Sequence, residues 1–153
     1  MRGFAASSTI RATPEAVWSV LVDGARWMEW DSAVVRVDGI IAPDAKVTVY
    51  PEVDPERGFA VRVVDLVRAE RMTWRGGMPL GLFTGTRTYR LTPGPDATVR
   101  FDMREEYTGV LAGLIFKSIP DLQPSFRRFA DGLKRRVEER ADGPTTSTDR
   151  SLR

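Results

Sequence analysis

Residues 10–21 read Ile-Arg-Ala-Thr-Pro-Glu-Ala-Val-Trp-Ser-Val-Leu and residues 27–30 read Trp-Met-Glu-Trp; together they decide the fold of this chain. Thr13 can accept hydrogen bonds from the free backbone N–H groups of a first helical turn, and Pro14 suits the first helical position because its missing N–H would be unpaired there. The apolar positions of this helix share one face: Pro14, Val17, Trp18 and Leu21. The segment therefore predicts the end of a strand, a capped short helix packed on a core, and an aromatic corner.

The composition excludes several kinds of chemistry. The 153 residues include neither cysteine nor histidine, and the formal net charge is +2. Structural zinc sites, Cys–His or Ser–His nucleophile pairs and histidine acid–base catalysis are therefore excluded. The small net charge does not indicate nucleic-acid binding, and no stretch approaches the ~18–20 apolar residues that cross a bilayer. The start of the chain lacks the apolar core of a signal peptide. We expect a cytoplasmic protein, a monomer or weak homodimer, with no cofactor, no metal and no membrane insertion.

After Trp30 the pattern becomes one of strands separated by short turn signals. With a first strand at residues 4–10, about seven strands are expected, and their short connections favour an antiparallel meander over parallel units with helical crossovers. The other six expected strands span residues 34–41, 46–53, 59–68, 71–75, 82–91 and 97–107.

The C-terminal part of the chain predicts a long amphipathic helix. Its boundary is expected at Ser118 or Ile119, because Pro120 disfavours helical geometry in the residue before it, and Asp121 is expected in its first turn. The apolar stripe comprises Leu122, Phe126, Phe129, Leu133 and Val137. This long apolar face can be buried only if the sheet curves around it. Residues 142–153 are polar and patternless, which predicts a disordered tail.

These elements resemble those of the START-type helix-grip superfamily, also called SRPBCC or polyketide cyclase/dehydrase-like proteins. The likeness covers roughly residues 3–141 and rests on the residue 10–21 block, Trp27 and Trp30, the Trp74-Arg75-Gly76 strand end, and the closing helix from Ile119 to Leu133. It implies an α+β helix-grip fold over residues 1–141: a curved antiparallel sheet around a long C-terminal helix, with two short helices after the first strand. Members of this superfamily enclose a hydrophobic cavity between helix and sheet.

The last predicted hairpin carries the most informative polar residues. If it turns near Gly94-Pro95, Arg87 and Glu105 become diagonal neighbours, close enough to pair. Period-2 alternation places the following residues on the inner face: Phe83, Arg87, Tyr89, Val99, Phe101, Met103, Glu105 and Tyr107. Because a buried ion pair is costly, it suggests a function: Arg87 would stabilise an enolate or bind a carboxylate, and Glu105 would move a proton. Alternatively, both side chains reach water at the open end of the cavity, or a bulge turns one of them outward.

Other inward-facing side chains complete the candidate site. Tyr89, Tyr107 and Trp74 combine an apolar body with a polar tip, which suits a flat oxygenated ligand or, equally, a core aromatic residue. Ser8 shares the face of Ile10 and is a candidate cavity hydroxyl. The candidate catalytic residues are Arg87, Glu105 and Tyr89, and the candidate ligand pocket comprises Ser8, Trp74, Phe83, Arg87, Tyr89, Phe101, Met103, Glu105, Tyr107, Phe126 and Phe129. Residues 76–85 are interpreted as a loop at the cavity rim, and residues 107–116 as either a lid or simple packing.

Three functions are consistent with this reading. The first is binding of a small hydrophobic ligand (polyketide-like, aromatic or lipid) in an internal cavity, with aromatase/cyclase or dehydratase activity in one version of it. The second is a non-catalytic carrier or self-resistance protein of a natural-product pathway, like the helix-grip proteins that bind enediyne toxins. The third is an interaction module resembling the heat-shock co-chaperone activators, which predicts an exposed apolar patch.

Overall fold

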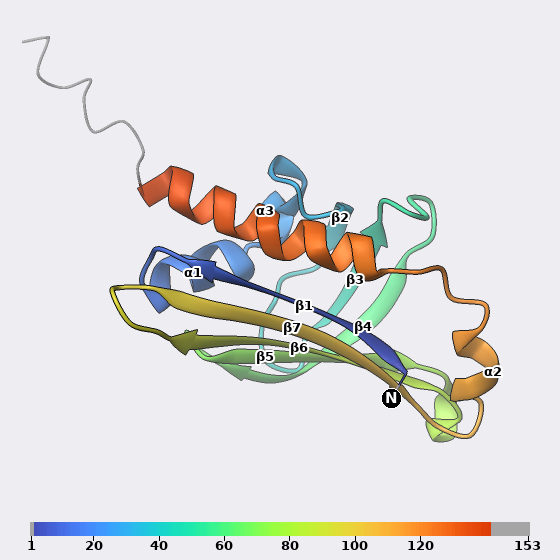
Figure 1. The fold of residues 1–153 in the computed structure, drawn as a ribbon. Coiled ribbons are helices and arrows are strands. Elements are labelled where there is room, and N and C mark those ends of the chain that lie inside the picture. Colours follow the sequence, from blue (N-terminus) through green and yellow to red (C-terminus); the bar gives the residue numbers. More distant parts are fainter. Residues whose placement is uncertain (1, 142–153) are drawn as a thin grey trace, which may run out of the picture.

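The computed structural model describes residues 2–141, in which a seven-stranded antiparallel sheet curves around a long C-terminal helix (Figure 1). The strand order is β1-β7-β6-β5-β4-β3-β2. The strands are β1 (Gly3–Ile10), β2 (Val34–Asp38), β3 (Lys46–Pro51), β4 (Phe59–Val67), β5 (Arg71–Gly77), β6 (Thr84–Pro93) and β7 (Val99–Thr108). The helices are α1 (Pro14–Leu21), α2 (Ala112–Phe116) and α3 (Gln123–Ala141), with 3-10 turns η1 (Gly24–Glu29) and η2 (Pro79–Gly81). The expected helix-grip architecture is confirmed; the expected tail at residues 142–153 lies outside the described part of the chain.

The N-terminal corner forms as its sequence predicts. Thr13 Oγ1 accepts a hydrogen bond from the backbone N–H of Ala16 at 3.2 Å, and Pro14 opens α1. Trp27 is fully buried, and its indole N–H donates to the carbonyl of Leu21 at 3.1 Å. Because this bond satisfies the one polar atom of the indole, the ring can fill the space between α1 and the sheet without an unpaired donor.

Helix α3 buries four of the five residues of the predicted stripe against the sheet: Phe126, Phe129, Leu133 and Val137. The fifth, Leu122, precedes the helix and is partly buried. The helix begins at Gln123, later than the expected boundary at Ser118 or Ile119. Asp121 does not lie in the first turn but precedes the helix, where its carboxylate accepts the backbone N–H of Gln123 at 3.0 Å. The side-chain oxygen takes up a donor that the helix itself cannot satisfy, so the helix starts after the carboxylate.

The outer edge of β1 is covered by side chains of α3. The side-chain amide of Gln123 donates to the carbonyl of Ala5 at 2.6 Å and accepts its N–H at 3.3 Å. Farther along, Lys134 Nζ donates to the carbonyl of Thr9 at 2.9 Å. These bonds occupy backbone groups that an exposed edge strand would offer to another chain.

The register of the β6–β7 hairpin differs from the expected one by two residues. Arg87 faces Glu105 directly, where a diagonal relation was expected, and Leu91 faces Phe101. The turn is centred on Asp96, one residue later than assumed, because residues 94–98 form a five-residue loop closed by the N–H of Gly94 on the carbonyl of Thr98 at 2.9 Å. A shift of two residues keeps every side chain on its predicted face, so the inward set is unchanged.

One further element was not expected as a helix: α2, inside the apolar segment at residues 107–116. Helices α1 and α2 lie at opposite ends of the sheet (Figure 1). Among residues 2–141, no helix is both long and apolar enough to cross a membrane.

Candidate functional site

Four polar side chains meet on the inner face of β6 and β7; we call Arg87, Tyr89, Glu105 and Tyr107 the polar cluster. Arg87 Nη2 lies 3.0 Å from Glu105 Oε2, and the Tyr107 hydroxyl donates to the same Oε2 at 2.6 Å. Arg87 Nη1 is 3.5 Å from the Tyr89 hydroxyl. The side chains of Arg87 and Glu105 are only 20% and 14% exposed. The two charges predicted on the inner face therefore do form an ion pair, mostly shielded from water.

Arg87 contacts α3, but one of its N–H donors has no hydrogen-bond partner among the described residues. The ring of Phe126 on α3 lies over its guanidinium, 4.8 Å from the ring centroid. The Arg87 Nε–H is buried and has no hydrogen-bond partner among the described residues. A buried donor without a partner costs about 1–3 kcal/mol. This cost is consistent with a group that awaits an acceptor from outside the protein.

Burial sets the protonation of the cluster at neutral pH. It raises the pKa of the Tyr107 hydroxyl well above its ordinary value, and the adjacent Glu105 carboxylate raises it further. Burial likewise raises the pKa of Tyr89, against the opposing effect of the Arg87 charge. For Arg87, burial alone would lower the pKa, but the Glu105 carboxylate and the Tyr89 hydroxyl together outweigh this effect and hold the pKa above its usual value. Both phenols therefore remain protonated, and the guanidinium remains cationic.

Aromatic rings surround Tyr107 at this end of the sheet. Phe83, just before β6, stacks on it with centroids 5.5 Å apart and an interplanar angle of 13°. Phe116 on α2 lies 5.7 Å from it, and Phe4 on β1 lies 6.2 Å from it. The sequence reading did not select Phe4 or Phe116. Phe4 could have been found, because strand alternation places it on the face of Ser8 and Ile10; no pattern marked Phe116.

Several other predicted pocket residues instead lie in the packed interior. We call Trp27, Trp74, Tyr89, Phe101 and Phe129 the aromatic core. Trp27 and Trp74 are stacked with centroids 5.5 Å apart, and Phe129 meets Trp27 edge-on at 4.9 Å. The predicted residue Met103 is also buried, at 2% exposure. These contacts agree with the alternative interpretation of Trp74 and Tyr89, in which both are large side chains that fill the core. Tyr89 belongs to the aromatic core and also to the polar cluster, because its hydroxyl reaches Arg87.

Ser8 serves the framework of the fold in this structure. Its hydroxyl donates to the carbonyl of Ala130 on α3 at 2.9 Å. The bond joins β1 to the long helix, so the hydroxyl is already engaged. The structure therefore brings together Phe83, Arg87, Tyr89, Glu105, Tyr107 and Phe126. It places Phe101, Met103 and Phe129 in the packed interior and joins Ser8 to α3, whereas Trp74 lies in the interior directly beside Arg87 on the neighbouring strand.

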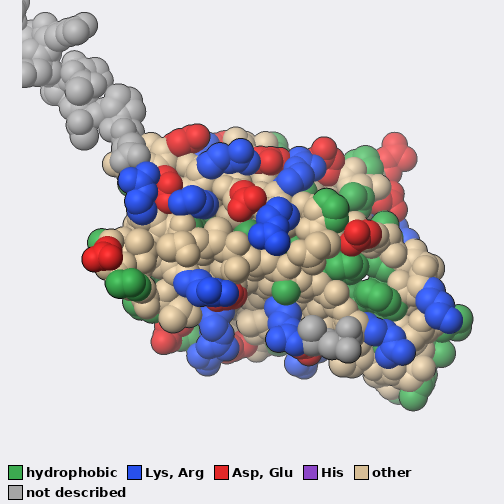
Figure 2. Space-filling view, in the orientation of Figure 1, with side chains coloured by type: hydrophobic (Ala, Val, Ile, Leu, Met, Phe, Trp, Pro, Cys, Tyr) green, Lys and Arg blue, Asp and Glu red, His purple; other side chains and the backbone are tan. Residues whose placement is uncertain are grey.

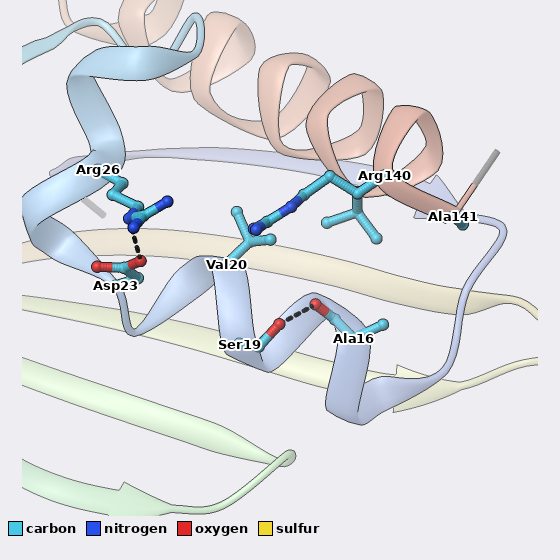
Figure 3. Close-up of a pocket in the computed structure, with 8 residues that line it drawn as sticks. Ala16, Ser19, Val20, Asp23, Arg26, Arg140 and Ala141 are labelled. Carbon is cyan, nitrogen blue, oxygen red and sulfur yellow. Dashed lines mark hydrogen bonds and ion pairs between the residues drawn. The ribbon is translucent and has the colours of Figure 1, made fainter. Parts of the chain in front are cut away.

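Two hollows lie away from the polar cluster. The larger, of about 510 Å³, lies between α1 and the end of α3 (Figure 3) and is lined by Ala16, Ser19, Val20, Asp23, Arg26, Val137, Arg140 and Ala141. Its polar groups bind one another: Ser19 donates to the carbonyl of Ala16, and Arg26 pairs with Asp23. The other, of about 390 Å³, is lined by Glu29, Trp30, Asp31, Gly132, Arg135, Arg136 and Glu139. None of the predicted pocket residues lines either hollow.

The end of the molecule near the polar cluster carries exposed apolar side chains. Leu80 on η2 is 96% exposed, Val110 after β7 is 84% exposed and Leu114 on α2 is 70% exposed. The backbone N–H of Leu111 bonds to the carbonyl of Leu82, which joins the two segments. Figure 2 shows hydrophobic side chains at the end that carries α2, whereas charges of both signs cover α3. In the described part of the chain, no group of three or more acidic side chains is arranged to hold a metal ion.

Comparison with known proteins identifies a family. Residues 1–138 match the family model described as polyketide cyclase/dehydrase and lipid transport. No curated protein matches the sequence.

Solved structures of low sequence identity share the fold. The aromatase/cyclase ZhuI from Streptomyces sp. R1128 is 15% identical with a TM-score of 0.69, over 92% of this chain and 95% of its own. BexL, a di-domain ARO/CYC of the BE-7585A biosynthetic pathway, is 17% identical with a TM-score of 0.69, over 94% of this chain and 48% of its own. DynU16, a protein of the dynemicin biosynthetic locus, is 16% identical with a TM-score of 0.62, over 90% of this chain and 48% of its own. This chain thus spans about half the length of the latter two.

Proposed function

Because this chain belongs to the polyketide cyclase/dehydrase and lipid transport family, we propose that it binds a small, largely apolar, oxygenated molecule of polyketide-like type at the polar cluster. The observation that carries the proposal is the pair of Arg87 and Glu105, 3.0 Å apart on the inner face of the sheet. Apolar side chains of similar size would stabilise the fold as well or better, so stability alone does not account for the pair. A ligand with carbonyl and hydroxyl groups would use both charges.

The same groups suit an aldol cyclisation followed by dehydration. Glu105 would remove a proton from a carbon between two carbonyl groups, and Arg87 would stabilise the resulting enolate oxygen. The enolate carbon would attack a second carbonyl carbon of the same molecule, and the alkoxide formed would take a proton from protonated Glu105. Loss of water would then require Glu105 to remove a second α-proton while the leaving hydroxyl is protonated by Tyr107, which recovers its proton from Glu105. Glu105 is the base in this scheme, because the raised pKa values keep both phenols protonated.

The test is turnover of a short β,δ,ζ-triketo thioester, followed by mass spectrometry; its α-carbon can attack the ζ-carbonyl and close a six-membered ring. Glu105→Gln and Arg87→Met are each expected to lower the rate of cyclisation by about 100-fold or more. Glu106→Gln is the matched control, because Glu106 pairs with Arg104 on the outer face of the same strand. If Glu105→Gln turned over every accepted substrate at the unaltered rate, the cyclase assignment would be wrong.

A non-catalytic carrier or self-resistance protein is the second candidate. It is favoured by the two hydrogen bonds on Glu105 Oε2, of 3.0 and 2.6 Å, because they hold the carboxylate in one place. Native mass spectrometry of protein purified from its own host distinguishes the two candidates. A stoichiometric ligand complex without turnover supports the carrier, and multiple turnovers contradict it.

A further inference from the structure

Two glycines face each other across β5 and β6, one rung from the polar cluster. Gly76 pairs with Gly85, and Gly85 pairs with Tyr107 on β7. Gly76 is required by packing, because a Cβ atom there would lie 2.7 Å from the carbonyl oxygen of Ala60. A Cβ atom on Gly85 would meet only the Tyr107 ring at 3.4 Å and Glu105 Oε1 at 3.8 Å, which are ordinary contacts. Neither a close neighbour nor a left-handed backbone accounts for glycine at position 85.

A glycine without a structural reason is unfavourable inside a strand. Relative to alanine it costs roughly 0.5–1 kcal/mol. Glycines within strands often mark places where a ligand approaches the backbone closely. At Gly85 the missing side chain leaves the backbone bordered by a tyrosine ring and a carboxylate oxygen.

The groups around Gly85 define what would fit there. Tyr107, with Phe83 stacked on it, offers a flat aromatic wall. Arg87 and Tyr107 both donate to Glu105 Oε2, so neither of these two hydrogen bonds uses Glu105 Oε1. Arg87 adds the Nε–H that has no partner among the described residues. The site thus combines an aromatic surface, one acceptor and one donor.

We infer that Gly85 is the floor of a subsite for a planar aromatic ring with a hydroxyl group beside a carbonyl group. The ring lies over the Gly85 backbone against Tyr107, the hydroxyl donates to Glu105 Oε1, and the carbonyl accepts from Arg87. This inference rests on the proposed function and adds the ligand class, an ortho-hydroxyaryl ketone.

The test uses two matched probes and five variants, of which Arg87→Met and Glu105→Gln test the polar cluster itself. The probes are 1-hydroxy-2-acetonaphthone, which has the hydroxyl beside the ketone, and 2-acetonaphthone, which lacks the hydroxyl. Gly85→Ala and Gly85→Val fill the space above the strand to increasing extents. Thr86→Val is the control, because Thr86 is the next residue of β6 and faces the other side of the sheet. Binding is measured by calorimetry, and the bound position by shifts of backbone amide signals in NMR spectra.

The expected result has three parts. The unaltered protein binds the hydroxyl probe about tenfold or more tightly than 2-acetonaphthone, as for a hydrogen bond to a charged group. Gly85→Val weakens binding of the hydroxyl probe by about tenfold or more, and Gly85→Ala weakens its binding less. Thr86→Val leaves the affinity for this probe unchanged. Gly85→Ala retains or raises the melting temperature, which shows that the loss of binding is not a loss of folding.

The negative results distinguish failure of the proposed function from failure of the Gly85 subsite alone. If neither probe binds the unaltered protein, or Arg87→Met and Glu105→Gln bind both probes normally, the polar cluster is not a ligand site, and the proposed function and this inference both fall. If Arg87→Met weakens binding but Gly85→Val does not, the cluster binds ligand elsewhere and only the inference is wrong. Equal affinity for the two probes also overturns the inference alone.

Discussion

Arg87 on β6 lies directly opposite Glu105 on β7, and the row continues to Trp74 on β5 and Phe4 on β1. The two charges are thus flanked along the sheet by large aromatic side chains, and Phe126 covers the guanidinium from the helix side. Little water can replace either partner if the other is removed. Each buried charge is therefore stabilised mainly by the other one.

Replacing Glu105 by glutamine should destabilise the fold. The variant keeps the shape of the side chain but leaves Arg87 mostly buried without its counter-charge, at a cost of about 2–4 kcal/mol in the free energy of unfolding. Urea denaturation measures the difference. Glu106→Gln breaks an exposed pair on the same strand and should cost less than about 1 kcal/mol. Equal effects of the two changes would contradict this account.

Removing both charges should restore stability and still abolish ligand binding. In the double variant Arg87→Met with Glu105→Leu, apolar side chains replace the pair, which is often neutral or stabilising by about 1–4 kcal/mol. Denaturation and calorimetry on the same sample separate the two effects. A double variant less stable than Glu105→Gln alone would show that the pair is needed by the fold.

The tyrosines of the polar cluster should resist ionisation. Because the pKa values of Tyr89 and Tyr107 are raised in the folded state, the native protein holds their protons more tightly than the unfolded chain does. Their contribution to stability is complete below about pH 10, the ordinary tyrosine value, and is lost as pH rises above it. Ultraviolet titration should therefore show these phenolates only together with alkaline unfolding. Tyr107→Phe should flatten the fall of unfolding free energy above about pH 10, and an unchanged slope would contradict the prediction.

Phe129 should be among the most sensitive positions of the aromatic core. It contacts the rings of Trp27, Trp30, Tyr89 and Phe101 and is 2% exposed. Phe129→Ala should cost about 3–5 kcal/mol, because the cavity it leaves is lined by rigid rings. Near-ultraviolet circular dichroism from the stacked tryptophans should weaken as well. Leu114→Ala, at an exposed apolar position, should stay within about 0.5 kcal/mol of the unaltered protein.

Glu138 on α3 should contribute to stability in a pH-dependent way. Burial opposes its ionisation, but hydrogen bonds from the Arg11 backbone N–H at 2.9 Å and from Lys134 Nζ at 2.6 Å, together with the positive charges of both side chains, outweigh burial and hold its pKa below the ordinary value. Its contribution is present above about pH 4.5 and is lost as pH falls through the lowered pKa. Glu138→Gln should therefore cost about 1–2 kcal/mol at pH 7 and less at pH 3. The neighbouring exposed Glu139→Gln should show no such difference.

The sequence predicted what depends on local patterns. The Thr13 cap, the buried Trp27 and the stripe on α3 each follow from a rule about neighbouring residues, and each is confirmed. The inner face of β6 and β7 follows from alternation alone. The predicted inner face is therefore correct, although the predicted register of the hairpin was wrong by two residues.

What the sequence could not predict depends on contacts distant in the chain or on rare backbone conformations. The hairpin register was wrong because Asp96 and Ala97 adopt left-handed conformations, with φ of 57° and 56°, which let the loop run over five residues. Alanine gives no sign of such a conformation. Whether an inward aromatic residue lines a cavity or fills the core was equally undecided by alternation. Trp74 and Phe101 lie in the core because Trp27 and Phe129 reach them from other elements.

The pairing of β1 with β7 means that β1 is synthesised well before the strand with which it pairs. Residues 3–10 leave the ribosome before the other strands of the described sheet. In that sheet they pair with residues 99–106, and the helix that covers their free edge is made later still. Until then the first strand carries unpaired backbone groups and an uncovered apolar face. Such long-range pairing slows folding and exposes surfaces that aggregate. We therefore expect a late, cooperative closure of the nascent chain, in which truncation before α3 releases an aggregation-prone sheet.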